Sequence, residues 1–295
     1  MQTLKVEQTM SIATACQHYG ISRQAYYKQI EALTTQQATT RMVVQLVREQ
    51  RINLPKLGTR KLHHLLKPQF EQMHIKLGRD GLFRLLRKAH MLVTPRRTYH
   101  KTTQSHHRFR KHPNLLKLGE SQVKPTGSEQ IWVADITYIP TREQTVYLSL
   151  ITDAYSRKIV GYHVHDSLHT AHVAKALKHA VKFRQTQQRL VHHSDRGIQY
   201  CSNEYQTIHA NSGITCSMTD GYDCYQNALA ERVNGILKQE FLLERPKDLA
   251  QARVMIAQSI ERYNCDRPHL SLQYKTPDAV HQASVNSFIS AQVEP

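Results

Sequence analysis

The chain has 295 residues, which is enough for two or three compact units that each bury a core. Its 40 lysines and arginines against 23 aspartates and glutamates give a formal net charge of +17, which favours a polyanionic partner such as nucleic acid. No apolar run approaches a membrane span, the N-terminus lacks a signal-peptide core, and the five scattered cysteines form no CxxC pair. These features exclude membrane and disulfide-rich secreted proteins, speak against a structural zinc site, and predict a cytoplasmic protein.

The first predicted element is a helix-turn-helix near the N-terminus. Ile12 and Ala15 follow helical spacing, Gly20 breaks the pattern, and Ser22 occupies an N-cap position before a second short helix. Arg23, at the start of that second helix, is a candidate DNA contact. A purely structural helical hairpin has the same outline and is the alternative.

A second helical pair is predicted to begin at Gly58. Its second helix, in "GRDGLFRLLRKAH", is amphipathic, with leucines on one face and basic residues on the other. The leucines are Leu82, Leu85 and Leu86, and the basic residues are Arg84, Arg87 and Lys88. The basic face is therefore a candidate DNA-binding surface.

A basic, polar segment follows the second helical pair. No acidic residue occurs between Asp80 and Glu120, and the segment from Pro95 to Gly127 reads as a linker. A solvated linker without a ligand is the alternative to nucleic-acid binding. The candidate DNA contacts in this segment are Arg96, Arg97, Arg108, Arg110 and Lys111.

Beyond Gly127 the pattern becomes that of a mixed α/β domain. Three β-branched and aromatic runs, at residues 130–140, 145–155 and 158–165, predict three consecutive antiparallel strands. The elements predicted next are a helix at about 168–184, a strand at 188–195, a helix at 203–211 and a strand at 213–218.

Asp135 lies in the middle of the first of these strands, with apolar neighbours on both faces. An unpaired carboxylate there costs several kcal/mol, so it needs a cation, an ion-pair partner or a proton. A buried aspartate paired with an arginine or capped by backbone donors is the structural alternative. Asp153, at the end of the second strand, is expected to accept hydrogen bonds from the backbone of Ser156 and Arg157.

The stretch "VHHSDRGIQY" offers several chemistries in ten residues. Asp195 ends the predicted fourth strand, where ligand-binding side chains collect. Zinc binding by His192 and His193, or a nucleophilic Ser194, are the alternatives, although no G-x-S-x-G turn surrounds the serine. We expect the two histidines to fill strand positions, one inward and one outward, with His193 near the DNA.

The segment "YQNALAERVNGILKQEF" is predicted to form one helix with an apolar stripe. On a different stripe, Asn227, Glu231, Asn234 and Lys238 recur at i, i+4, i+7 and i+11. Such a stripe aims a carboxylate, two amides and an ammonium toward one side of the helix. An ordinary solvated face is the alternative.

Together these segments resemble the DDE transposases and retroviral integrases. Thirty-five residues separate Asp195 from Glu231, which is the second gap of that family. The chain is most similar to the OrfB-type transposases of bacterial insertion sequences that have two overlapping frames, from about Ser11 to Val280. One departure is Gln226, where the family usually has an aspartate. The motifs that carry the resemblance are "GISRQAYY", "LGTRKL", "WVADITYI", "HHSDRGIQY", "SMTDGYDCYQNALAERVNGILKQE" and "YNCDRPHLSLQYKTP".

The resemblance implies an RNase H-like, integrase-type α/β core with a mixed five-stranded sheet, preceded by an α-helical helix-turn-helix region. The expected divisions are a helix-turn-helix region at 1–54, a second DNA-binding region at 55–95, a basic linker at 96–127, the catalytic core at 128–282 and a tail at 283–295.

The resemblance also implies the site residues. Asp135, Asp195 and Glu231 would be catalytic and would bind two Mg²⁺ ions, with Mn²⁺ as a substitute and Asp135 shared by both ions. Lys238 would contact the DNA near the cut strand, and Asn227 and Asn234 are further candidate DNA contacts. Two such ions stabilise the attacking and leaving oxygens of a phosphodiester.

The implied function is metal-dependent cleavage at insertion-sequence ends, followed by strand transfer. The first implied partner is double-stranded DNA, which includes the terminal inverted repeats and the target. The others are a second copy of the chain in a synaptic complex and the product of an upstream frame. A non-catalytic DNA-binding regulator of transposition and an RNase H-like nuclease are the alternatives.

Overall fold

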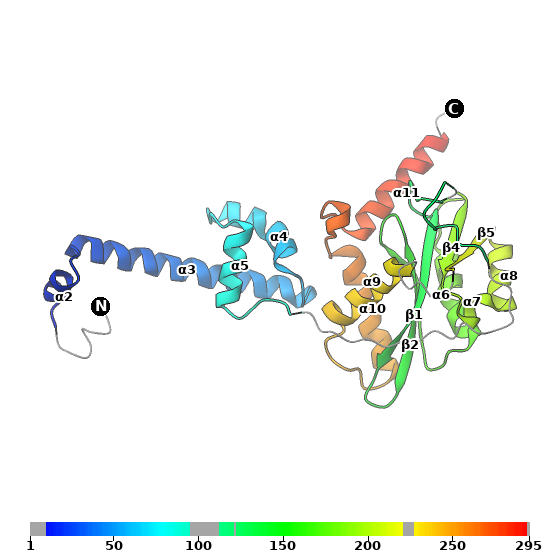
Figure 1. Cartoon of the computed structure of the whole chain (residues 1–295), viewed down its shortest axis with the longest axis horizontal. Helices are drawn as coiled ribbons and strands as arrows, with labels where there is room; N and C mark the ends of the chain where they lie inside the picture. Colours follow the sequence, from blue (N-terminus) through cyan, green and yellow to red (C-terminus); the bar gives the residue numbers. More distant parts are fainter. Residues whose placement is uncertain (1–9, 95–111, 121, 221–226, 294–295) are drawn as a thin grey trace. The chain divides into compact units, whose positions relative to one another are not determined.

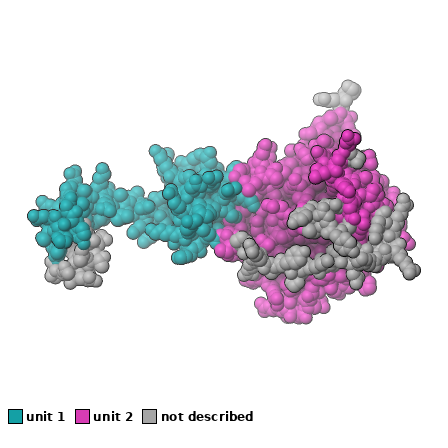
Figure 2. Space-filling model, viewed as in Figure 1, with its two compact units in different colours: residues 1–52, 58–92 teal, residues 53–57, 93–295 magenta. Residues whose placement is uncertain are grey.

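The computed structural model describes residues 10–94, 112–120, 122–220 and 227–293. The chain forms two compact units, Met1–Ile52 with Gly58–Leu92 and Asn53–Leu57 with Val93–Pro295 (Figure 2). Within the described residues, no helix combines the length and the apolar character that a membrane crossing requires.

The first unit is helical and begins with α2 (Ile12–His18) and α3 (Arg23–Asn53). Gly20 turns the chain between them with a φ of +63°, and the Ser22 hydroxyl accepts a hydrogen bond from the backbone N–H of Ala25 at 3.0 Å. The prediction of a short second helix was wrong, because α3 has 31 residues. No glycine or proline interrupts it before Pro55, and Arg23 is exposed at its first position.

The second helical pair consists of α4 (Thr59–Gln72) and α5 (Arg79–Lys88). Leu82 and Leu86 are fully buried, and Leu85 is half-buried. The three basic residues of α5 that were predicted on the opposite face, Arg84, Arg87 and Lys88, are exposed. The predicted amphipathic helix is therefore confirmed.

Part of the segment predicted as a linker belongs to the second unit. We call residues 112–120 and 122–127 the strap. Leu115, Leu116 and Val123 of the strap pack against the sheet, and the N–H of Leu115 donates to Ser217 Oγ at 3.0 Å. A linker reaching to Gly127 is therefore wrong for the strap, because these three apolar side chains are half-buried against the sheet. The five basic residues predicted to contact DNA from the linker lie outside the described residues.

The second unit is built on a five-stranded sheet (Figure 1). Its strands are β1 (Ile131–Pro140), β2 (Thr145–Asp153), β3 (Ile159–His165), β4 (Leu190–Ser194) and β5 (Ile214–Met218). The order is β3-β2-β1-β4-β5, in which β1, β2 and β3 are antiparallel neighbours and β4 runs parallel to β1 and β5. The predicted mixed five-stranded sheet is confirmed.

Helices cover both faces of this sheet (Figure 1). Trp132 and Ala134 of β1 pack in a core with the helices of one face, and Ile139 packs in a second core with the helices of the other face. The first face carries α6 (Thr170–Lys182), α7 (Ile198–Cys201) and α8 (Asn203–Asn211). The second carries α9 (Ala228–Ile236), the π-helical turn η2 (Leu237–Phe241) and α10 (Leu249–Cys265). Beyond α10 come the short helical turn η3 (Leu270–Leu272) and α11 (Pro277–Val293).

The helix predicted over residues 225–241 is helical from Ala228 to Phe241, but its last five residues form the wider π-helical turn η2. Residues 225 and 226 lie outside the described residues. The turn η2 keeps Leu237 in the core while Glu240 forms an ion pair with the buried Arg267 at 2.7 Å.

Asp153 has the structural role predicted for it. Its Oδ1 accepts hydrogen bonds from the backbone N–H of Tyr155 at 3.1 Å and of Ser156 at 2.8 Å. Its Oδ2 accepts from the N–H of Glu129 at 2.7 Å, whereas the N–H of Arg157 bonds to the main-chain carbonyl of Asp153. Asp153 is therefore committed to the turn that follows β2.

Candidate active site

The parallel pairing of β1 with β4 brings the two candidate aspartates together. Ile131 pairs with Val191 and Val133 pairs with His193, so the two strands keep a constant register. The same offset separates Asp135 from Asp195. Because residues at one level of parallel strands point to the same face, both carboxylates belong to the face covered by α9.

Asp195 is fixed by the turn that follows β4. The strand ends at Ser194, and Asp195 Oδ1 accepts the backbone N–H of Gly197 at 2.9 Å. A Cβ on Gly197 would lie 2.9 Å from the same oxygen, which is too close for a carbon atom. Gly197 therefore both donates to the carboxylate and leaves room for it. Sequence reasoning did not assign this role, although a glycine two residues after the aspartate was its signal.

Two asparagines join α9 to β1 next to Asp135. Asn234 Nδ2 donates to Asp135 Oδ2 at 2.7 Å, and Asn227 Nδ2 donates to the carbonyl of Ala134 at 3.0 Å. Both asparagines are buried, and neither Oδ1 has a hydrogen-bond partner within the described residues. The predicted polar stripe therefore faces β1 at Asn227 and Asn234, whose amide N–H groups act within the protein.

Glu231 and Lys238 complete the stripe from two different turns. Glu231 lies in the first turn of α9 and is exposed, whereas Lys238 lies in η2 and is half-buried. Burial lowers the pKa of Lys238, and the negative charge of Asp135 opposes this shift. Lys238 is therefore close enough to sense the carboxylate of Asp135.

The three carboxylates lie in one another's electric field. The pKa of Asp135 is raised to about 7, mainly by burial and then by the charges of Asp195 and, least, Glu231, while the hydrogen bond from Asn234 opposes the rise. Burial also raises the pKa of Glu231, again with a contribution from Asp195. Each pair of the three thus interacts, as expected of carboxylates that converge on one site.

The donor chemistry of the site fits a hard cation. No ion pair among the described residues involves Asp135, so the predicted alternative of an arginine partner is not realised there. Three carboxylates are ligands of the kind that Mg²⁺ takes. Among the described residues, no three histidine, cysteine, aspartate or glutamate side chains are grouped so that they can hold a metal ion.

The other polar residues of "VHHSDRGIQY" are structural. His192 Nε2 hydrogen-bonds with the hydroxyl of Tyr205 at 3.2 Å, and His193 Nδ1 hydrogen-bonds with Ser217 Oγ at 2.8 Å. Both histidines are fully buried, so the expectation that one of them points outward, with His193 near the DNA, was wrong. The reason is that helices and the strap cover both faces of the sheet. The hydroxyl of Ser194 donates to the backbone carbonyl of Asp195 at 3.0 Å rather than to a histidine.

The chain matches known proteins over most of its length. Two family descriptions, both named "Integrase core domain", match residues 125–224 and 212–277. The uncharacterized 31 kDa protein of insertion element IS600 from Shigella sonnei is 34% identical over 271 residues, which cover 90% of this chain and 97% of that protein.

Two transposases match a shorter region. The transposase of insertion sequence IS904 from Lactococcus lactis is 35% identical over 168 residues, 56% of this chain and 65% of that protein. The putative transposase of IS986/IS6110 from Mycobacterium tuberculosis is 32% identical over 173 residues, 57% of this chain and 61% of that protein. The matched region thus spans somewhat less than two thirds of either transposase. Among solved structures, the catalytic core domain of HTLV-2 integrase aligns with 54% of this chain and 99% of its own length, at 20% identity and a TM-score of 0.44.

Proposed function

Because this chain belongs to the DDE transposases of bacterial insertion sequences, which carry an integrase core domain, we propose that Asp135, Asp195 and Glu231 are its catalytic and metal-binding residues. The family's reaction is DNA transposition, in which phosphodiester bonds are cut and rejoined. The observation that supports the residue assignment is that the parallel register of β1 with β4 brings Asp195 to the level of Asp135, while Asn234, three residues after Glu231 on α9, bonds the Asp135 carboxylate.

Two Mg²⁺ ions, with Mn²⁺ as a substitute, would stabilise the attacking and leaving oxygens of the reacting phosphodiester when bound. Asp135 would contribute to both ions, Asp195 to one and Glu231 to the other. Each ion would then take two of the three carboxylates as ligands. Magnesium tolerates such a sparse set, because it keeps several of its waters.

The protein's own residues prepare the site. The hydrogen bond from Asn234 fixes one oxygen of Asp135, and the N–H of Gly197 fixes one oxygen of Asp195. The half-buried ammonium of Lys238 adds positive charge on the same side, where a DNA phosphate adds negative charge. These groups hold the carboxylates in place before DNA arrives, so less order has to be gained during the reaction.

The proposed partners follow from the charge and from the reaction. The first proposed partner is double-stranded DNA, both as element ends and as target, whose negative phosphates would be attracted by the net charge of +17. The exposed Arg23 and the basic face of α5 would contribute to this binding. Joining two DNA ends calls for a second copy of the chain in a synaptic complex. The upstream-frame product is a further proposed partner, and the cytoplasm, where bacterial DNA lies, is the proposed location.

The test is Mg²⁺-dependent cleavage of DNA that carries the element end. We expect Asp135→Asn, Asp195→Asn and Glu231→Gln each to abolish cleavage while DNA binding is retained. Glu143→Gln is the matched control, because Glu143 is an exposed carboxylate in the β1–β2 turn. Retained cleavage in any one of the three variants would remove that residue from the site.

A further inference from the structure

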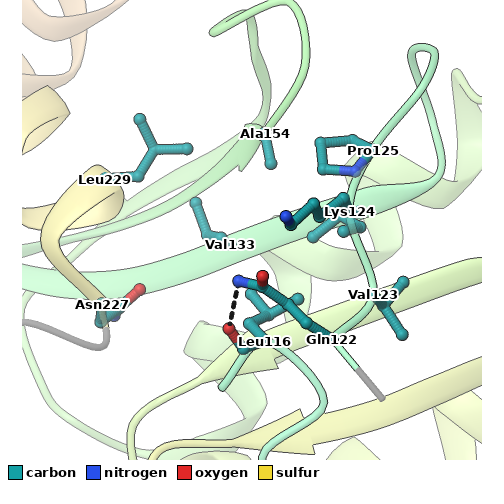
Figure 3. A pocket seen from close by; sticks show the side chains of 10 residues that line it. Leu116, Gln122, Val123, Lys124, Pro125, Val133, Ala154, Asn227 and Leu229 are labelled. Carbon is teal, nitrogen blue, oxygen red and sulfur yellow. Dashed lines mark hydrogen bonds between the residues drawn. The ribbon is translucent and has the colours of Figure 1, made fainter. Parts of the chain in front are cut away.

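A cavity of about 180 Å³ lies between the strap and the first residues of β1, beside the N-terminal end of α9 (Figure 3). Its walls are mainly apolar and include Leu116 and Pro125 from the strap, Val133 from β1 and Leu229 from α9. An apolar cavity of about 150 Å³ suffices to bind benzene. This one therefore has room for one small planar ring system.

Asn227 supplies a buried acceptor at this cavity. The side chain lines it, is only 6% exposed, and uses its Nδ2 to bond the carbonyl of Ala134 (Figure 3). Its Oδ1 has no hydrogen-bond partner within the described residues. A buried acceptor without a partner is unfavourable, so a ligand that brings an N–H donor to this atom gains affinity.

Lys124 adds a positive charge at the same cavity. It belongs to the strap, lines the cavity and is exposed, so its ammonium can meet an anion that stays in solvent (Figure 3). The site thus offers an apolar slot, one inner acceptor and one outer cation. A nucleotide has the complementary parts, which are a flat ring, an exocyclic amine and a phosphate.

We propose that this cavity binds one unpaired base with an exocyclic amine, adenine or cytosine, from the DNA strand beside the cleaved phosphodiester. The base amine donates to Asn227 Oδ1, and a flanking phosphate contacts Lys124. The location supports this, because Asn227 bonds the carbonyl of the residue that precedes Asp135. Enzymes that act on DNA do extrude bases into such pockets. The inference rests on the proposed function in that DNA is the ligand.

The first test is base fluorescence in the complex of the full chain with element-end DNA. 2-Aminopurine is placed next to each adenine and each cytosine that flanks the cleavage site, so that extrusion of the native base, with its amine intact, unstacks the probe. Metal ions are removed with EDTA so that the DNA stays intact. We expect a several-fold rise at one position. Leu116→Trp, which fills the cavity, should abolish the rise, whereas Leu118→Trp, on a strap residue that is 86% exposed, should leave it.

The outcomes separate this inference from the catalytic assignment. Bound DNA without a rise at any position, or a rise that persists in folded Leu116→Trp protein, would overturn the base pocket. Cleavage retained by Asp135→Asn would overturn the catalytic triad and leave the fluorescence result valid. If the chain does not bind the DNA at all, both the base pocket and the proposed function are contradicted.

The second test removes the amine from the base beside the responsive probe. Purine in place of adenine, or 2-pyrimidinone in place of cytosine, should weaken binding to the wild-type chain roughly 3- to 10-fold, as the loss of one hydrogen bond does. The same change should have no further effect in Asn227→Leu, which lacks the acceptor. An equal loss in both chains would show that the amine does not meet Asn227.

Discussion

Asn234 of α9 donates a hydrogen bond of 2.7 Å from Nδ2 to Oδ2 of Asp135 in β1. This bond favours the charged form of a carboxylate that burial and two neighbouring carboxylates push toward the protonated form. Asn234 therefore has two effects, since it orients one oxygen of Asp135 and lowers the pKa of its carboxyl.

We expect Asn234→Leu to slow Mg²⁺-dependent cleavage roughly 10- to 100-fold at pH 7, which is the range for losing a hydrogen bond to a charged group. The pKa of Asp135 should rise in this variant, so raising the pH should restore part of the rate. The measurement is the pH profile of single-turnover cleavage. Gln239→Leu, an exposed amide in η2, is the matched control. If Asn234→Leu slows cleavage without shifting the pH profile, Asn234 orients Asp135 but does not set its pKa.

The raised pKa of Asp135 predicts a pH-dependent cost in stability. The carboxyl titrates near 3.8 in the unfolded chain and at about 7 in the fold, so the native state holds the proton more tightly. Stability from this group is fully present below about pH 3.8 and is lost as the pH rises through 7. The difference corresponds to a cost on the order of 4 kcal/mol above pH 7.

Asp135→Asn should therefore be more stable than the wild type in EDTA at pH 8, and the difference should shrink toward pH 4. Urea unfolding of both chains across this range measures it. Added Mg²⁺ should stabilise the wild type at pH 8, because the ion binds the native carboxylates, and should stabilise Asp135→Asn less. A stability difference that does not change with pH would contradict the raised pKa.

The sequence predicted elements well where local signals agree. The helix predicted at 203–211 has those bounds in the structure, because Ser202 caps its start and Gly213 follows its end with a φ of +63°. Asp135 and Asp195 were singled out as candidates because a carboxylate within or just after an apolar strand is costly without a partner, and the register of β1 with β4 places them at the same level. Pattern and residue type sufficed in both cases.

Features that depend on tertiary contacts were not predictable in this way. The strap was read as linker because the whole segment from Pro95 to Gly127 is polar and basic, and only the packing of Leu115, Leu116 and Val123 on the sheet shows that its last part belongs to the second unit. The partner of Asn234 depends on how α9 docks on β1, and helical periodicity cannot give that. The turn η2 allows both the burial of Leu237 and the ion pair of Glu240 with Arg267, and these contacts are not visible in the local sequence.

Gly197 is expected to be required for activity more than for stability. Gly197→Ala keeps the N–H that bonds Asp195, but the new Cβ would lie 2.9 Å from Oδ1 and would push the carboxylate aside. A misplaced catalytic group commonly costs about 100-fold in rate. We expect a loss of at least about tenfold in cleavage, with a small change in Tm.

Gly235→Ala is the matched control for this substitution. Gly235 lies within α9, and a Cβ there would meet nothing within 4 Å. Alanine in a helix interior is more favourable than glycine by roughly 1 kcal/mol, so this variant should be slightly stabilised and active. If Gly197→Ala cleaves DNA as well as Gly235→Ala does, the close approach of Gly197 to the Asp195 carboxylate is not required for activity.

A buried network fastens α11 to the sheet through His281. Its Nδ1 hydrogen-bonds with Ser156 Oγ at 3.0 Å, and its Nε2 lies 3.6 Å from Glu129 Oε1. Ser156 Oγ in turn donates to Asp153 Oδ1 at 2.8 Å. Burial opposes ionisation of Glu129, yet the hydrogen bonds from His281 and from the backbone of residues 185 and 186 lower its pKa.

We expect His281→Ala to lower the free energy of unfolding by about 3 kcal/mol at pH 7, because it leaves a buried carboxylate with fewer partners. Gln282→Ala, on the exposed side of α11, should change it by no more than about 0.5 kcal/mol. Adding Glu129→Gln to His281→Ala should recover part of the loss, since the amide removes the buried charge. Urea unfolding of the four chains measures each step. No recovery in the double variant would place the cost in packing around His281 rather than in the charge of Glu129.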